Sequence, residues 1–171
     1  MTAFVTGYRA RARELYVAED AHDHGSAAAT FLALFDDGVT LHARWLGNHT
    51  ALVIRDQAIV WQTRPHSLRN LLVEAGHDLA GAEVPSIVTR MVSTDPQMLE
   101  DVPDRAAFTD RRAGDRLVLG GHELHDQLTP DELIGLTAGT PPALAAQALL
   151  ERVVTRSDPF GFVVGVCDLA T

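Results

Sequence analysis

The chain has 171 residues, of which 46% are hydrophobic, and its formal net charge is −9. This length suits one domain, residues 1–171, with a substantial hydrophobic core. The negative charge argues against nonspecific nucleic-acid binding, because contacts with phosphate groups require a basic surface.

Neither a membrane span nor a secretory signal is indicated. No apolar run approaches the roughly 20 residues that a membrane helix needs. Residues 1–9 contain no basic segment followed by an apolar stretch, so we expect a cytoplasmic location. The one cysteine, Cys167, cannot form an internal disulfide, which suits a reducing compartment. It lies in the apolar run 162–168 and is predicted to be a buried, unreactive side chain.

The amino-terminal segment is the least clearly patterned. In residues 4–17, Arg9, Arg11 and Arg13 alternate with small residues, which is compatible with a strand. The role of residues 1–24 stays open.

Four strands are predicted next. Residues 29–35 and 39–46 flank Asp36-Asp37-Gly38, a strong turn signal, and the second segment alternates apolar with polar residues. The segments 51–54 and 58–62 are apolar, β-branched runs on either side of a short turn, which is typical of a hairpin. We expect these four segments to form one antiparallel meander.

The middle of the chain changes character. Ser67 is a good N-cap for a helix that ends near Gly76. Residues 85–92 form a shorter helix candidate with proline in the first turn. The two prolines in residues 94–104 predict a loop, and the acidic stretch 100–110 is interpreted as a solvated surface loop.

Two helices and a strand are predicted at the carboxyl end. Thr129 is an N-cap, Pro130 occupies the first helical position and Glu132 has capping-box spacing. A last helix begins at residues 140–142, with apolar positions at helical spacing: Leu144, Ala145, Ala148, Leu149 and Val153. Residues 162–166 are predicted to form a closing strand.

Residues 114–126 are the most informative segment. They read Gly-Asp-Arg-Leu-Val-Leu-Gly-Gly-His-Glu-Leu-His-Asp, which predicts a buried strand, a turn and then a helix. The segment resembles the run Gly-Asp-Arg-Leu-Leu-Leu-Cys-Ser-Asp-Gly-Leu-Thr-Asp of the metal-dependent type 2C serine/threonine phosphatases. His122 stands where that family has a metal-binding Asp.

Four further segments resemble the same family in the same order. Residues 46–56 resemble Val-Gly-Asp-Ser-Arg-Ala-Tyr-Leu-Leu-Arg-Asp, and residues 62–68 resemble Leu-Thr-x-Asp-His-Ser-Leu. Residues 87–90 resemble Ile-Thr-Arg, and residues 158–164 resemble Asp-Asn-x-Thr-x-Val-Val. Over about residues 25–169, the resemblance implies an α+β fold. We therefore expect a mainly antiparallel β-sheet sandwich with helices, a reduced form of the phosphatase α-β-β-α arrangement.

The departures from the family concern the metal site. This chain has no Asp-Gly-Met-Gly-Gly loop, Asn48 replaces one Asp and His122 replaces another. Asp158 keeps a family carboxylate position, but Pro159 follows it in place of Asn. Two hard divalent cations need several carboxylate oxygens. The resemblance thus implies a pseudophosphatase with no catalytic residue, no resident metal and no other cofactor.

A replacement site for one metal ion is the alternative. His122 and Asp158, with Glu123 or Asp126, offer imidazole and carboxylate ligands of the kinds that zinc, manganese or magnesium accept. The competing interpretation is that these four are polar loop residues without a ligand.

The remaining candidates are predicted to be structural or solvent-facing. His42 lies on the polar side of a strand, and His66 lies at a helix start. Trp45 and Trp61 fall on strands expected to be adjacent, and we predict that both pack in the core on the face covered by helices.

These observations favour a non-catalytic, phosphatase-like binding or regulatory protein with a protein partner. A chain without the family's first third would leave an apolar sheet face or edge uncovered, which predicts a homodimer or a tight heteromer. The alternative function is a divergent hydrolase with a single metal near His122 and Asp158. A third possibility is that a companion chain supplies the missing metal loop.

Overall fold

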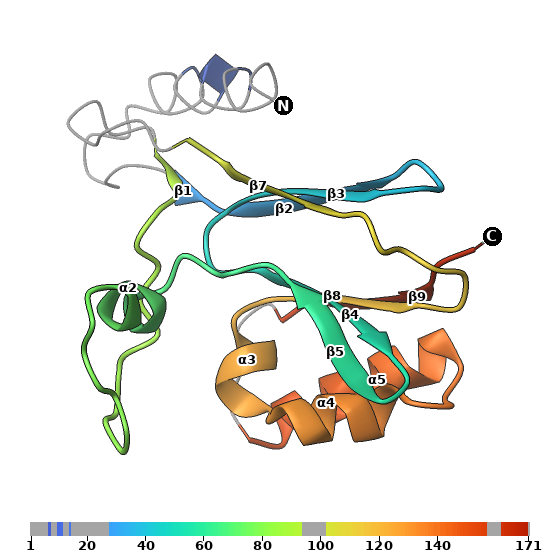
Figure 1. The fold of residues 1–171 in the computed structure, drawn as a ribbon. Helices are drawn as coiled ribbons and strands as arrows, with labels where there is room; N and C mark the ends of the chain where they lie inside the picture. Colours follow the sequence, from blue (N-terminus) through green and yellow to red (C-terminus); the bar gives the residue numbers. More distant parts are fainter. Residues whose placement is uncertain are drawn as a thin grey trace.

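The computed structural model of the protein describes residues 28–93, 102–156 and 162–170, together with Gly7, Ala10, Arg11 and Glu14. Two antiparallel sheets are stacked face to face, and helices α3, α4 and α5 cover the outer face of one of them (Figure 1). The predicted fold class, an α+β sandwich of mainly antiparallel strands, is confirmed. No helix in these ranges is long and apolar enough to cross a membrane.

The first sheet has the strand order β2-β3-β7. Its strands are β2 (Phe31–Asp36), β3 (Leu41–Leu46) and β7 (Asp104–Phe108). A short pair, β1 (Ala28–Ala29) with β6 (Val92–Ser93), lies close to it. The β2–β3 turn is the predicted one: Gly38 has φ of 87°, and the Asp36 and Asp37 carboxylates accept hydrogen bonds from turn N–H groups.

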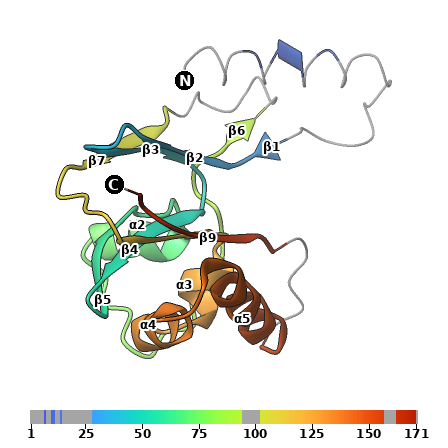
Figure 2. The ribbon, with the colours of Figure 1, turned by 90° about the vertical axis from the view of Figure 1, so that its right-hand side faces the viewer.

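The second sheet has the order β5-β4-β8-β9 (Figure 2). Its strands are β4 (Thr50–Arg55), β5 (Ala58–Gln62), β8 (Arg116–Gly120) and β9 (Val164–Asp168). The hairpin β4–β5 is confirmed, with positive φ at both turn residues, Asp56 and Gln57, as tight hairpin turns require.

The predicted four-stranded meander is wrong, because β3 and β4 belong to different sheets. The chain crosses between the sheets at residues 47–49. Gly47 makes this crossing possible: its φ is 113°, and a Cβ atom there would lie 2.2 Å from the Thr30 Cβ. Only glycine combines that backbone conformation with that close approach.

Successive side chains of β4 point to opposite faces of the sheet and contribute to two hydrophobic clusters. Leu52 and Ile54 pack with Val118 and the helices, whereas Val53 packs between the sheets. Trp61 also packs against the inter-sheet core, 5.9 Å from the Phe108 ring between centroids, so its predicted position under the helices is wrong.

Trp45 lies in the other sheet from Trp61, on β3 rather than on an adjacent strand. It is buried, its Nε1 donates a hydrogen bond of 2.8 Å to the Arg64 carbonyl, and its ring stacks on His66. Its predicted structural role is therefore correct, although the predicted face is not.

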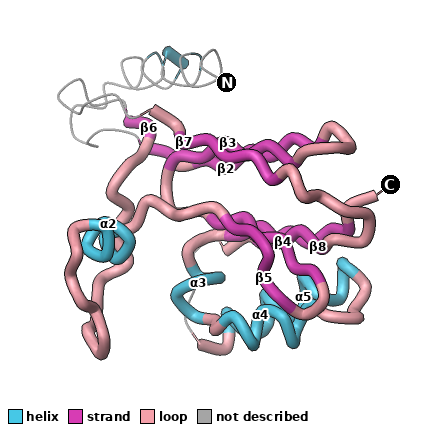
Figure 3. Tube along the Cα trace, viewed as in Figure 1, coloured by secondary structure: helices cyan, strands magenta, loops and turns pink. Residues whose placement is uncertain are grey.

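The helices follow the predicted caps (Figure 3). Helix α2 (Leu68–Glu74) is capped by Ser67, and α4 (Pro130–Thr137) has the complete Thr129–Glu132 capping box. Helices α3 (Glu123–Gln127) and α5 (Pro142–Val154) complete the set in the described ranges. The buried stripe of α5 is Ala145, Leu149 and Val153, whereas Leu144, predicted on that stripe, is exposed.

Three predicted elements differ from the structure. Residues 85–92 do not form a helix, because the Ile87 carbonyl and the Thr89 N–H bond to the chain beside α2. In place of the predicted acidic loop, β7 begins at Asp104, while residues 94–101 lie outside the described ranges. The expected amino-terminal strand is also wrong at the described positions, which are helical, with an Arg11–Glu14 ion pair of 2.9 Å.

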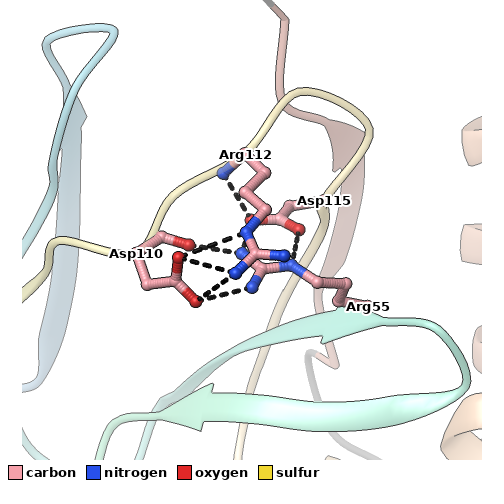
Figure 4. A network of polar contacts seen from close by, with 4 residues as sticks. All are labelled: Arg55, Asp110, Arg112 and Asp115. Atoms are coloured by element: carbon pink, nitrogen blue, oxygen red, sulfur yellow. Dashed lines mark hydrogen bonds and ion pairs between the residues drawn. The ribbon is translucent and has the colours of Figure 1, made fainter.

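Four charged residues tie the β4–β5 turn to the connection between β7 and β8 (Figure 4). Asp115 is 1% exposed, and Arg55 donates to both of its carboxylate oxygens at 2.6 and 2.7 Å. Arg55 also donates to Asp110, and the Arg112 N–H donates to Asp115 at 2.8 Å. Burial opposes ionisation of Asp115, but the hydrogen bonds from Arg55 and Arg112 outweigh it and lower the pKa of that carboxyl.

The surroundings of Gly47 and Gly135 predict opposite effects on stability when each glycine is replaced by alanine. Gly47→Ala should destabilise the protein by about 1–3 kcal/mol through backbone strain and the contact with Thr30. Gly135→Ala, in α4 with open space around its Cβ position, should stabilise by about 0.5–1 kcal/mol. Urea unfolding measures both, and equal effects of the two substitutions would contradict the strain argument.

Removing the Arg55 guanidinium should leave the Asp115 carboxylate buried without its bidentate partner. Arg55→Met should therefore lower the urea midpoint far more than Arg69→Met, which changes an exposed arginine on α2. The double change Arg55→Met with Asp115→Leu should recover part of the loss, because no unpaired charge remains. Additive losses in this double-mutant cycle would show that the pair is not coupled.

Candidate functional site

A cleft of about 480 Å³ lies where β2, the β3–β4 crossing, the end of β8 and the start of β9 come together. Four segments line it: β2, the β3–β4 crossing, the β8–α3 turn and the start of β9. The lining residues include Leu32, Asn48, His49, Leu119, His122, Glu123 and Val163. The candidate site thus gathers residues that are far apart in the sequence.

Two glycines fix the turn from β8 into α3. A Cβ atom on Gly120 would lie 2.4 Å from the Leu124 Cδ1, and one on Gly121 would lie 2.3 Å from the Glu123 Oε2. Because both positions must lack a side chain, α3 starts directly against the end of β8. This places His122 and Glu123 at the cleft.

Among the residues that the structure describes, the polar side chains lining the cleft are one carboxylate, two imidazoles and one amide. The His122 Nδ1 lies 3.4 Å from the Glu123 Oε2, and that carboxylate is mostly buried. His49 forms a hydrogen bond of 2.8 Å with the Thr30 hydroxyl, and Asn48 is buried beside it. Burial lowers the pKa of His49; the Glu123 carboxylate opposes this shift and His122 adds to it.

Sequence reasoning missed His49. The residue follows Asn48 in the segment that resembles the phosphatases, but the pattern does not show that the crossing turns its side chain toward Glu123. Two features of the sequence could have indicated His49. It follows Asn48, which stands where the family has an Asp, and it lies two residues after Gly47, where the chain crosses between the sheets.

Asp126 and its neighbour His125 lie apart from the cleft. The Asp126 carboxylate accepts a hydrogen bond of 2.8 Å from the Ser86 hydroxyl. His125 lines a second cavity of about 320 Å³ together with Thr50 and Leu133. Its Nδ1 lies 3.3 Å from the Thr50 hydroxyl. Its buried Nε2 has no hydrogen-bond partner among the described residues, and the Asp126 Oδ1 lies 3.4 Å from it. Burial lowers the pKa of His125, a shift that Asp126 opposes and His122 reinforces.

The predicted metal candidates are therefore only partly brought together. His122 and Glu123 share the cleft, Asp126 does not line it, and Asp158 lies outside the described residues. Within the described part of the chain, no three His, Cys, Asp or Glu side chains are grouped to hold a metal ion. In the described part of the cleft, one carboxylate with imidazole and amide groups offers fewer oxygen ligands than a pair of hard cations needs.

Other sequence candidates have structural positions. The buried His66 accepts a hydrogen bond from the Gly47 N–H and contacts Asp104 at 3.1 Å, as its predicted structural role requires. His42 is exposed, as predicted, and pairs with Asp37. The predicted burial of Cys167 is wrong: its side chain is exposed, because β9 is the last strand of its sheet among the described residues.

The fold is that of the type 2C (PPM) serine/threonine phosphatase catalytic domains. The S. agalactiae serine/threonine phosphatase is 21% identical, with a TM-score of 0.77 over 95% of this chain and 66% of that one. The M. tuberculosis phosphatase PstP is 22% identical, with a TM-score of 0.76 over 96% of this chain and 68% of that one. PppA, a key regulatory component of T6SS in Pseudomonas aeruginosa, is 20% identical, with a TM-score of 0.73 over 96% and 67%.

This chain thus spans about two thirds of the length of the phosphatases that it matches. The catalytic domain of PstP has been solved in complex with two manganese ions. No family model matches this chain, and no curated protein sequence is significantly similar to it. At these identities the likeness establishes the fold, and activity has to be argued from the site.

His49 and His125, both partly buried, predict a loss of stability in mild acid. Because the folded state lowers the pKa of His49 and His125, the unfolded chain binds more protons once the pH falls toward the ordinary histidine value. The urea midpoint should therefore fall between pH 7.5 and pH 5.5. The double variant His49→Gln, His125→Gln should show a smaller fall, and the exposed His77→Gln should behave like the wild type. An unchanged pH dependence in the double variant would refute this assignment.

Proposed function

We propose that the protein is a non-catalytic, phosphatase-like binding or regulatory protein whose cleft receives a protein partner. The observation that carries the proposal is the set of polar groups in the cleft. Where the phosphatase resemblance expects acidic residues, the chain has the Asn48 amide and the His122 imidazole. The Nε2 of the neighbouring imidazole, His49, forms a hydrogen bond with the Thr30 hydroxyl.

These groups do not suit the hydrolysis of phosphate esters. That reaction is very slow without a catalyst, and a pair of metal ions accelerates it by activating water and neutralising the leaving oxygen. Asn48 is neutral, the pKa of His49 is lowered, and Glu123 is the one carboxylate among the described residues of the cleft. This supports a role in binding rather than in catalysis.

The same cleft has features of a binding surface. Leu32 and Leu119 line it, and Val163 at its rim is 73% exposed. An apolar wall with a few convergent polar groups is typical of sites that take up a ligand or a partner side chain. A component of a phosphorylation pathway is the partner class that we propose from the phosphatase-like scaffold.

The first test is an assay of hydrolysis with p-nitrophenyl phosphate and a phosphopeptide, in the presence of Mn²⁺ or Mg²⁺. We expect no hydrolysis above the buffer rate, because the cleft lacks the oxygen ligands for a metal pair. In capture experiments, Val163→Glu at the cleft rim should reduce partner binding, while Val60→Glu on β5 should not. Metal-dependent hydrolysis that Asp158→Ala abolishes would overturn the proposal.

The second candidate is a hydrolase with one metal ion, favoured by the contact between His122 and Glu123 in the cleft. Metal analysis of the purified protein separates the two functions. Stoichiometric zinc or manganese that disappears in His122→Ala and stays in His77→Ala would favour the enzyme. A protein without bound metal, whose unfolding is unchanged by added Mn²⁺, would support the binding protein.

A further inference from the structure

The open edge of β9 has no strand beside it among the residues that the structure describes. The backbone N–H and C=O groups of Leu169 point toward the β8 side. The Leu169 N–H donates to the Asp115 carbonyl, and the Leu169 carbonyl accepts from the Gly114 N–H. Backbone groups alternate in direction along an antiparallel strand. Val164, Val166 and Asp168 therefore present their N–H and C=O groups at the open edge.

This edge lacks the features by which proteins block unwanted strand pairing, such as lysine, proline or a bulge. The register of β8 with β9 is continuous, and the Asp168 charge is held by Arg116 at 2.7 and 3.0 Å. The opposite edge of the same sheet is different. The β4–β5 register shifts between Val53 and Ile54, which leaves Val60 without a partner and bends that edge.

Gly165 gives a second, independent indication. A Cβ atom there would lie 3.9 Å from the Leu119 side chain, an ordinary contact, and its φ is not positive. Nothing in the described chain requires glycine at this position, although glycine in a strand costs about 0.5–1 kcal/mol relative to alanine. A glycine within a strand often marks the close approach of another backbone or side chain.

We propose that β9 pairs with β9 of a second copy of this chain, antiparallel and with Val166 on the two-fold axis. In this register Val166 faces Val166 of the second copy, and both edges use their outward N–H and C=O groups. All five residues of β9 take part, and Val164 faces Asp168, so that no like charges are opposed. A two-fold axis elsewhere along β9 would shorten the ladder.

The pairing explains Gly165 and completes the cleft. Cys167 of the second copy lies opposite Gly165, on the side of the strand that faces the other sheet. Since Gly165 lines the cleft, the thiol of the second copy joins the cleft wall next to Leu119. The two copies of Cys167 are diagonal neighbours, about 7–8 Å apart, which is too far for a disulfide. The dimer is therefore non-covalent.

The same arrangement brings apolar helix surface together. Helix α5 packs beneath β9 (Figure 2), so pairing of the two β9 strands places the two α5 helices next to each other. Leu144, Leu150 and Val154 of α5 are exposed in the single chain. Contacts between the two α5 helices would add to the backbone hydrogen bonds of the extended sheet. The dimer does not depend on whether the cleft is catalytic.

Sedimentation velocity at micromolar concentrations tests the proposal. The wild type should be a dimer of the 18.5-kDa chain, with or without reductant, and Cys167→Ser should remain a dimer. Cys167→Lys should weaken the dimer by roughly tenfold or more, because two ammonium groups then lie as diagonal neighbours across the axis and each is brought against the cleft wall of the other copy. Val60→Lys, on the bulged edge, should leave it unchanged.

Amide hydrogen exchange of the wild-type protein tests the proposal without any substitution. In the dimer the amides of Val164, Val166 and Asp168 should be protected, and dilution below the dissociation constant should expose them. A monomeric wild type, a dimer lost on reduction, or a dimer unaffected by Cys167→Lys would each overturn the proposal. None of these outcomes bears on phosphate-ester hydrolysis, so the dimer and the function of the cleft are judged separately.

Discussion

The contact between Arg55 and Asp115 holds together the part of the chain where the two sheets are joined. Asp115 lies on the connection from β7 in one sheet to β8 in the other, and Arg55 ends β4. A carboxylate that is 1% exposed is tolerated only when hydrogen bonds and an opposite charge replace the water it has lost. The guanidinium supplies both, and it also lies over the Phe108 ring at 5.7 Å, which anchors it against β7. Through Phe108 and Asp110, this link also holds the β4–β5 turn against the chain that leads from β7 into β8.

A second connection between the sheets forms the cleft itself. The crossing at Gly47 carries Asn48 and His49, and the turn at Gly120 and Gly121 carries His122 and Glu123. In both places the chain can turn only because a side chain is missing, and in both places the next residues project into the cleft. The site is thus a consequence of how two sheets are connected. Steric exclusion at Gly47, Gly120 and Gly121 orders the chain at these turns.

Local sequence patterns predicted most of the helices and strands, because the interactions that start or end these elements involve residues close together in the sequence. The Ser67 cap, the Thr129–Glu132 capping box and the β4–β5 hairpin are examples. Membership of a sheet was not predictable in the same way: alternation along residues 39–62 shows which side chains are buried but not which sheet buries them. The misplacement of Trp61 follows from this limit.

Strand β7 was missed because it begins with two charged residues, Asp104 and Arg105, which are not typical of a strand. The Asp104 carboxylate forms ion pairs with Arg90 and His66, which are distant in sequence. The position of His49 beside Glu123 likewise depends on the crossing.

The exchange of acidic for neutral groups changes what the cleft needs in order to stay folded. Several carboxylates crowded at one sheet end repel one another, and bound cations normally offset that repulsion. Here Asn48 is uncharged, burial favours the neutral form of His49, and Glu123 has His122 within 3.4 Å. Among the described residues of the cleft, Glu123 is a single carboxylate with an imidazole next to it, a weaker concentration of negative charge than a metal pair would offset. A cleft with little charge is consistent with the proposed binding role, and the thiol that β9 pairing would add to its wall is again an uncharged group.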